Sequence, residues 1–189
     1  MPTSNTISVE KKKLEKPPLA LHFLGDRVLR QKAKRISRVD ATVRDLAKEM
    51  LQTMYSSDGI GLAAPQVAVN KQMLVVDDEP DNAAKPPLVL INPVIKAFSR
   101  EIAIGQEGCL SVPGVFLDVK RPAAIEVQFK DERGRPQKIF ANDLLARVIQ
   151  HEMDHLNGVM FVDRVENQMA LTEALGECGF AVGSVQAIA

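Results

Sequence analysis

Residues Gln150–His155 read QHEMDH, and this stretch decides how the rest of the chain is interpreted. If it forms a helix, His151 and His155 lie one turn apart on the same face. Two imidazoles at that spacing can bind one metal ion, and Glu152 between them can reach the water that the metal holds. The stretch therefore predicts a metal-bearing helix.

The residues around this stretch support a helix. Asn142–Asp143 can form its N-terminal cap, the helix itself covers about Leu144–Leu156, and Asn157–Gly158 is a suitable stop. Leu144 and Val148 continue the stripe of the two histidines at helical spacing. The histidines are thus predicted to lie on the apolar, core-facing side.

A third ligand is needed, and the residues alone leave its identity open. The only other histidine is His22, and the longer HExxHxxGxxH pattern fails because Phe161 stands at its last position. A downstream carboxylate or a cysteine can complete such a site. The candidates are Glu173, Glu177, Cys109 and Cys178.

Patterns elsewhere indicate an α+β fold with mainly antiparallel strands, a long helix before them and the metal-bearing helix after them. The long helix is predicted over Asp40–Ser57 from apolar residues at spacings of three and four, with Asp40 as its cap. Short apolar or alternating runs predict strands. These are Met73–Val76, Leu88–Ile91, Ile125–Lys130 and Gln137–Ala141.

Length and composition favour one globular unit with a tail. The chain has 189 residues, of which 46% are hydrophobic and 25% charged. Residues 1–18 are predicted to be a flexible polar extension, and residues 19–189 a single catalytic domain whose last 15 or so residues are loose. The segment from Val165 has no Lys or Arg and is predicted to begin as a helix.

Charge and cysteine usage exclude several classes of protein. The net charge is zero, which argues against a general nucleic-acid binder. Two cysteines in dissimilar contexts favour a reducing compartment over a disulfide framework. No apolar run is long enough to cross a membrane, and the N-terminus lacks a secretory signal.

Three segments together resemble the peptide deformylase family. Gly59–Gln66 is similar to the family motif GxGLAAxQ, Glu107–Ser111 to EGCLS, and Gln150–His155 to QHExDH. The order and rough spacing also agree, and the resemblance spans about residues 19–165. HExxH alone is shared by many metallopeptidases, so the three motifs together are what make the resemblance specific.

The resemblance implies an amide hydrolase that removes the formyl group from the N-terminal formyl-methionine of newly made polypeptides and releases formate. It implies one divalent metal per chain, held by Cys109, His151 and His155. That metal is Fe(II) in vivo, with Zn, Ni or Co possible in preparations. It further implies that Glu152 transfers the proton, while the Gln66 amide and the Leu110 backbone N–H face the formyl oxygen.

The resemblance also suggests a substrate pocket, partners and a location. Ile60, Gly61, Leu144 and Val148 are expected near the methionine side chain, although core packing explains Leu144 and Val148 almost equally well. The expected partners are formylated nascent polypeptides and transiently the ribosome, with no specific nucleic acid and no membrane. A bacterial cytoplasmic location is favoured over an organellar one.

The HExxH motif is also compatible with two other functions. One is a small metallopeptidase that uses Glu173 or Glu177 as the third ligand. The other is a non-enzymatic module with a structural metal, in which Glu152 beside an open metal position would serve no purpose. Both leave Gly59–Gln66 unexplained.

Overall fold

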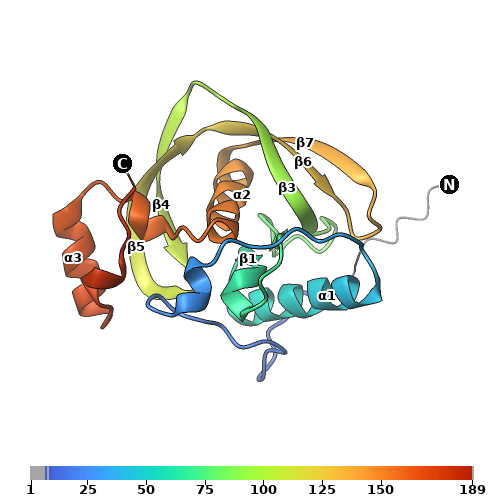
Figure 1. The fold of residues 1–189 in the computed structure, drawn as a ribbon, viewed down its shortest axis with the longest axis horizontal. Helices are drawn as coiled ribbons and strands as arrows, with labels where there is room; N and C mark the ends of the chain where they lie inside the picture. Colours follow the sequence, from blue (N-terminus) through green and yellow to red (C-terminus); the bar gives the residue numbers. More distant parts are fainter. Residues whose placement is uncertain (1–6, 8, 189) are drawn as a thin grey trace.

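The structure is a computed structural model that describes residue 7 and residues 9–188. It confirms the α+β class, with three α-helices and two antiparallel sheets in this part of the chain (Figure 1). The helices are α1 (Ala41–Ser56), α2 (Asp143–Leu156) and α3 (Gln168–Glu177). The strands are β1 (Gly61–Ala63), β2 (Met73–Val76), β3 (Leu88–Phe98), β4 (Ile102–Cys109), β5 (Val112–Pro122), β6 (Ala124–Lys130) and β7 (Pro136–Asn142).

The larger sheet has the strand order β1-β2-β3-β6-β7, and β4 and β5 form a separate hairpin. Helix α2 lies between this hairpin and the larger sheet, and α1 runs along the sheet's other side (Figure 1). None of the helices in the described residues is long and apolar enough to span a membrane.

The strand β2 shows why the central strands are apolar without interruption. Met73 and Val75 pack in the cluster of side chains around α1, whereas Leu74 and Val76 pack in the cluster around α2. A strand covered on both faces has no solvent-facing positions, so the polar alternation of a half-buried strand disappears. The apolar runs at Met73–Val76 and Leu88–Ile91 were therefore correct signals for strands.

The boundaries of α1 and α2 agree with those expected. The Asp40 side chain accepts a hydrogen bond from the Val43 backbone N–H at 3.1 Å and caps α1. Asn142 precedes α2 without a side-chain capping bond. Gly158 follows α2 with a φ of +74°, and a Cβ there would lie 2.6 Å from the Arg30 carbonyl oxygen. Only glycine fits this end of the helix.

The strand β3 continues past the predicted end at Ile91. Asn92 adopts a φ of +50°, and the register with β6 shifts between Ile91 and Val94. The Asn92 side chain accepts from the Ile36 N–H at 2.8 Å and donates to the Ile36 carbonyl at 2.7 Å. Asn92 and Pro93 thus mark a β-bulge within one strand, not its end.

The hairpin β4–β5 is absent from the strands predicted from the sequence. Cys109 is the last residue of β4, and the turn follows it at Leu110 and Ser111. The strand signal is weak because Ile102 and Ile104 point to solvent, with 53% and 65% of their surface exposed. Glycines within β4 lower its apparent propensity further.

The described part of the N-terminal segment packs against the domain. Ile7 is buried in the cluster around α1. The Lys11 ammonium lies 2.6 Å from an Asp77 carboxylate oxygen and donates to the carbonyls of Asn82 and Lys85 at 2.9 and 2.8 Å. The Asp77 side chain is fully buried. A division of the chain at residue 18 stays a prediction. The composition of the segment could not show that Lys11 has the buried Asp77 as its partner.

The C-terminal segment is also tied to the domain. After α3, the Gln186 N–H donates to the Asp163 carboxylate at 2.8 Å, and the Ile188 N–H donates to the Asp163 carbonyl at 2.9 Å. Arg30 donates to the Gly158 carbonyl at 3.2 Å, to the Asp163 carboxylate at 2.5 Å and to the Ser184 carbonyl at 2.7 Å. These bonds attach the described end of the chain to the domain, and the looseness expected of the last 15 or so residues stays a prediction.

The Lys11–Asp77 pair generates a prediction on stability. Lys11→Met removes the cation from a buried carboxylate, which costs about 3 kcal/mol of unfolding free energy. For a domain of this size the melting temperature should fall by roughly 6–12 °C. Calorimetry compares it with Lys12→Met, because Lys12 pairs only with the exposed Glu10. Equal melting temperatures of the two variants would contradict the prediction.

Candidate functional site

Three potential metal ligands converge between the β4–β5 hairpin and α2. Cys109 ends β4, and His151 and His155 lie one turn apart on α2. Their ligand atoms all lie within 4.8 Å of one another, and Cys109 Sγ is 3.3 Å from His155 Nε2. In the described part of the chain this is the one group of three or more such side chains close enough to hold a metal.

The donor set fits a divalent metal ion. A thiolate and two imidazoles suit Fe, Zn, Ni or Co, and three protein ligands leave a position open for water. His151 Nδ1 lies 2.9 Å from a Glu107 carboxylate oxygen, which leaves Nε2 free to face the other two ligands. Such a carboxylate behind a histidine fixes the tautomer that binds metal. The sulfur–nitrogen separation of 3.3 Å suits two ligands of one tetrahedral ion.

The other carboxylate and cysteine candidates lie elsewhere. Glu173 and Glu177 are exposed on α3, and Cys178 is exposed just after it. None of the three belongs to the converging group. The arrangement thus favours Cys109 as the third ligand and leaves the metallopeptidase alternative without a ligand from α3.

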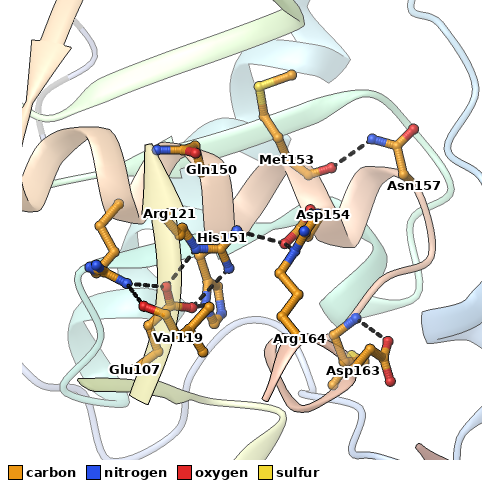
Figure 2. Close-up of polar contacts among 12 residues, drawn as sticks. Glu107, Val119, Arg121, Gln150, His151, Met153, Asp154, Asn157, Asp163 and Arg164 are labelled. Carbon is orange, nitrogen blue, oxygen red and sulfur yellow. Dashed lines mark hydrogen bonds and ion pairs between the residues drawn. The ribbon is translucent and has the colours of Figure 1, made fainter. Parts of the chain in front are cut away.

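A chain of buried ion pairs runs behind His151 (Figure 2). The Glu107 carboxylate accepts from Arg121 at 2.5 and 2.9 Å, and Arg121 donates also to Asp154 at 2.8 Å. Arg164 binds the same Asp154 carboxylate through two nitrogens, at 2.6 and 2.7 Å. Burial opposes ionisation of Glu107, but the hydrogen bonds from Arg121 and His151 hold its pKa well below the usual range. Glu107 therefore stays a carboxylate and a constant acceptor for the His151 N–H.

Glu152 lies next to the ligands in an apolar setting. Its side chain is buried, and its Oε2 has no hydrogen-bond partner among the described residues. Burial raises the pKa of Glu152 to about 7. A Cβ on Gly61 would lie 2.4 Å from Glu152 Oε1, so the absence of a side chain at Gly61 makes room for this carboxyl group. A carboxyl with such a pKa can both accept and return a proton near neutral pH.

Gln66 is held beside Cys109 by its own hydrogen bonds. Its Oε1 accepts from the Ala63 N–H at 2.8 Å, so its Nε2 is the end that points to the site. That nitrogen donates to Ser111 Oγ at 3.1 Å and lies 3.5 Å from Cys109 Sγ. The Gln66 amide is therefore oriented as a donor toward the site.

A cavity of about 740 Å³ opens onto these groups. Cys109, His151 and Glu152 line it, whereas His155, only 1% exposed, is not among its lining residues. The remaining residues predicted for the site also line this cavity: Gln66, Leu110, Ile60, Gly61, Leu144 and Val148. Leu144 is 48% exposed at α2's first turn, so it belongs to the cavity and not to the core stripe.

Sequence reasoning missed several residues of this site. Phe23 and Phe116 add aromatic surface to the cavity, with 46% and 60% of their surface exposed. Arg147 lines the cavity from α2, and Arg121 reaches Glu107 from β5. Arg147 follows Leu144 by three positions and precedes His151 by four, so helical spacing could have placed it on the same face.

Comparison with known proteins adds an independent line of observation. The family model described as "Polypeptide deformylase" matches residues 19–170. Peptide deformylase 1 of Nostoc sp. is 66% identical over 183 residues, which is 97% of this chain and 98% of the relative. A peptide deformylase of Thermosynechococcus vestitus is 65% identical, with the same two coverages.

Solved structures of peptide deformylases also match most of this chain. The crystal structure of a peptide deformylase from Synechococcus elongatus, in complex with actinonin, matches with a TM-score of 0.95 and 62% identity. The match covers 97% of this chain and 100% of that chain. A plant peptide deformylase structure matches with a TM-score of 0.80 and 38% identity, over 87% and 89% of the two chains.

The convergence of the three ligands generates a prediction on metal binding. Cys109→Ala removes the thiolate ligand and should lower metal content to well below one ion per chain after dialysis. Cys178→Ala is the matched control and should retain the metal content of the unmodified protein. Elemental analysis of the three proteins measures this, and equal content in all three contradicts the assignment of Cys109.

Proposed function

Because this chain belongs to the polypeptide deformylase family, we propose that Cys109, His151 and His155 hold its metal and that Glu152 moves the proton in the family's reaction. The enzyme is a peptide deformylase, which removes the N-terminal formyl group from newly made polypeptides. One observation supports the site most strongly: the ligand atoms of Cys109, His151 and His155 lie within 4.8 Å of one another, beside a cavity that Glu152 also lines.

The family is metal-dependent, and the metal that we propose is Fe(II) in vivo, with Zn, Ni or Co able to occupy the site in preparations. A bound divalent metal supplies a Lewis acid that lowers the pKa of water toward neutrality. The Cys109 thiolate is a soft ligand and suits these ions better than it suits Mg²⁺ or Ca²⁺.

Glu152 acts first as a base and then as an acid. It accepts a proton from the attacking water, whose oxygen bonds to the formyl carbon. When the carbon–nitrogen bond breaks, Glu152 returns that proton to the departing amine nitrogen. The products are formate and a polypeptide with a free N-terminus. The pKa of Glu152, raised by burial to about 7, suits both steps.

Two hydrogen-bond donors stabilise the charge that develops on the formyl oxygen. We assign this role to the Gln66 Nε2 group and to the Leu110 backbone N–H, which follows Cys109 in the turn after β4. Gln66 is already oriented by the Ala63 N–H and Ser111, and donation to the formyl oxygen would replace its long contact of 3.5 Å with Cys109 Sγ. A donor of this kind typically contributes about 2.7–4 kcal/mol at the transition state.

The cavity next to these groups receives the first residue of the substrate. Ile60, Leu144 and Val148 give its wall an apolar surface suited to a methionine side chain. At Gly61, in β1, the backbone is free to pair with an extended peptide, as an added strand would. This assignment is part of the same proposal.

The proposed partners are formylated nascent chains and, transiently, the ribosome in a bacterial cytoplasm. From Val165 onward the sequence has no Lys or Arg, so the C-terminal segment does not offer a basic surface to RNA. We treat residues 19–189 as one catalytic domain.

The test of the function is formate release from a short formyl-methionyl peptide by the whole chain, loaded anaerobically with Fe(II) or with Ni. We expect release from both forms and its loss with a chelator. If neither form releases formate while metal is bound, the proposed function is wrong.

Glu152→Gln should keep fold and metal while losing most turnover. The amide cannot accept the proton, and a positioned acid–base group typically contributes about 10²–10⁴-fold. The expected result is a drop of kcat within that range, with unchanged metal content and circular dichroism. Near-normal kcat would remove Glu152 from the proposed role.

Gly61→Ala should lower kcat although it changes no ligand. The added Cβ would come within 2.8 Å of a Val148 methyl and closer still to the Glu152 carboxyl, so Glu152 must move. We expect a loss of at least tenfold in kcat with normal metal content, since small displacements of a reacting group are costly. Gly176→Ala is the control, because nothing lies within 4 Å of a Cβ there. Equal kcat for the two variants would show that the space at Gly61 is not needed.

A further inference from the structure

We propose that Arg147 determines which first side chain the enzyme prefers, by presenting the face of its guanidinium group as part of the cavity wall. The inference rests on the proposed function, since it places the first residue of the substrate in this cavity. Arg147 lines the cavity beside Leu144 and Val148, and its side chain is 13% exposed.

Both terminal nitrogens of the Arg147 guanidinium donate to the protein. Its Nη1 donates to a Glu107 carboxylate oxygen at 2.8 Å and to the Val119 carbonyl at 2.9 Å, with a longer contact of 3.4 Å to the Gly105 carbonyl. Its Nη2 donates to the Ala103 carbonyl at 2.9 Å. These bonds hold the terminal nitrogens against β4 and β5, so the planar face of the group is the surface that we assign to the substrate.

Gly105 shows how that plane is oriented. A Cβ on Gly105 would stand 3.0 Å from Cζ, Nε and Nη2 of Arg147 alike. Equal distances to three atoms of one plane mean that the missing Cβ points at the face of the group. One face thus packs flat on the β4 backbone, and the opposite face is the one available to the cavity.

The chemistry of such a face distinguishes side chains of equal size. A guanidinium is weakly hydrated and stacks on aromatic rings, and the negative face of a ring is attracted to the cation. A thioether sulfur is polarisable and a weak acceptor. A methylene group offers neither property. The wall should therefore favour methionine and phenylalanine over norleucine, which matches methionine in shape but has a methylene in place of sulfur.

Arg147 has a buried anionic partner, which lowers the free-energy cost of placing its charge at the wall of an apolar cavity. Glu107 pairs with Arg147 and is shared with Arg121, whose Nε and Nη2 donate to the same carboxylate. An unpaired buried cation would disfavour binding of an apolar side chain, because that side chain would displace the water that solvates the charge. Because Arg147 is paired with Glu107, it can form wall surface at a smaller penalty.

The experiment measures kcat/KM for formyl-methionyl, formyl-norleucyl and formyl-phenylalanyl peptides that are otherwise identical. The ratio of two substrates on one preparation does not depend on metal content or on the active fraction. We expect the unmodified enzyme to prefer methionine over norleucine by about threefold, in the range of an exposed cation–π contact. The preference should arise in KM, with similar kcat values.

Arg147→Lys and Arg147→Met should both bring this ratio close to one, since lysine keeps the charge but loses the planar face. Arg164→Met is the matched control: it removes an arginine from the ion-pair chain but not from the cavity, so the ratio should stay unchanged. A ratio that survives in both Arg147 variants would overturn the proposal. A lysine variant that behaves like the unmodified enzyme would do so as well.

Gly105→Ala provides a second variant in which Arg147 and its charge remain. The added Cβ presses on the packed face and moves the guanidinium toward the cavity. We expect KM for the formyl-phenylalanyl peptide to rise severalfold more than KM for the formyl-methionyl peptide. An equal change in KM for both peptides would contradict the proposal about Arg147. Absence of formate release from every peptide would instead contradict the proposed function.

Discussion

The buried carboxylate of Glu107 connects the β4–β5 hairpin to helix α2 and fixes how the two lie relative to each other. It accepts hydrogen bonds from Arg121 on β5 and from Arg147 and His151 on α2, while itself belonging to β4. A carboxylate removed from water is stable only when its oxygens are fully bonded. Any shift of the hairpin relative to α2 would break one of these bonds. The same requirement therefore fixes the hairpin, the helix and the orientation of the His151 ring.

The larger sheet supplies the rest of the geometry. Because β2 is covered by α1 on one face and by α2 on the other, the short strand β1 at its edge is held close to α2. Gly61 in β1 lets the Glu152 carboxyl approach, and Gly105 in β4 lets the Arg147 guanidinium lie flat. At both positions the absence of a side chain lets a functional group of α2 approach a strand. The two strands belong to the two different sheets.

Much of this could be predicted from sequence, because the signals were local. Helical spacing placed His151 and His155 on one face, and the Asp40 cap marked the start of α1. The hydrogen-bond partners of Glu107 could not be predicted in this way, because they lie far from it in the sequence and no spacing rule connects the positions. The contacts of Lys11 with Asp77 were missed for the same reason. The hairpin β4–β5 was missed because its alternation places isoleucines in solvent.

The contacts of Arg30 indicate at what point during synthesis the enzyme can form its native contacts. Arg30 is synthesised well before Gly158, Asp163 and Ser184, yet it donates hydrogen bonds to all three. Cys109 likewise meets His155 only across a separation of 46 residues. Contacts between distant segments form only after the later segment has left the ribosome. The enzyme that processes other newly made chains therefore cannot assemble its own site until the segment that carries His155 has left the ribosome.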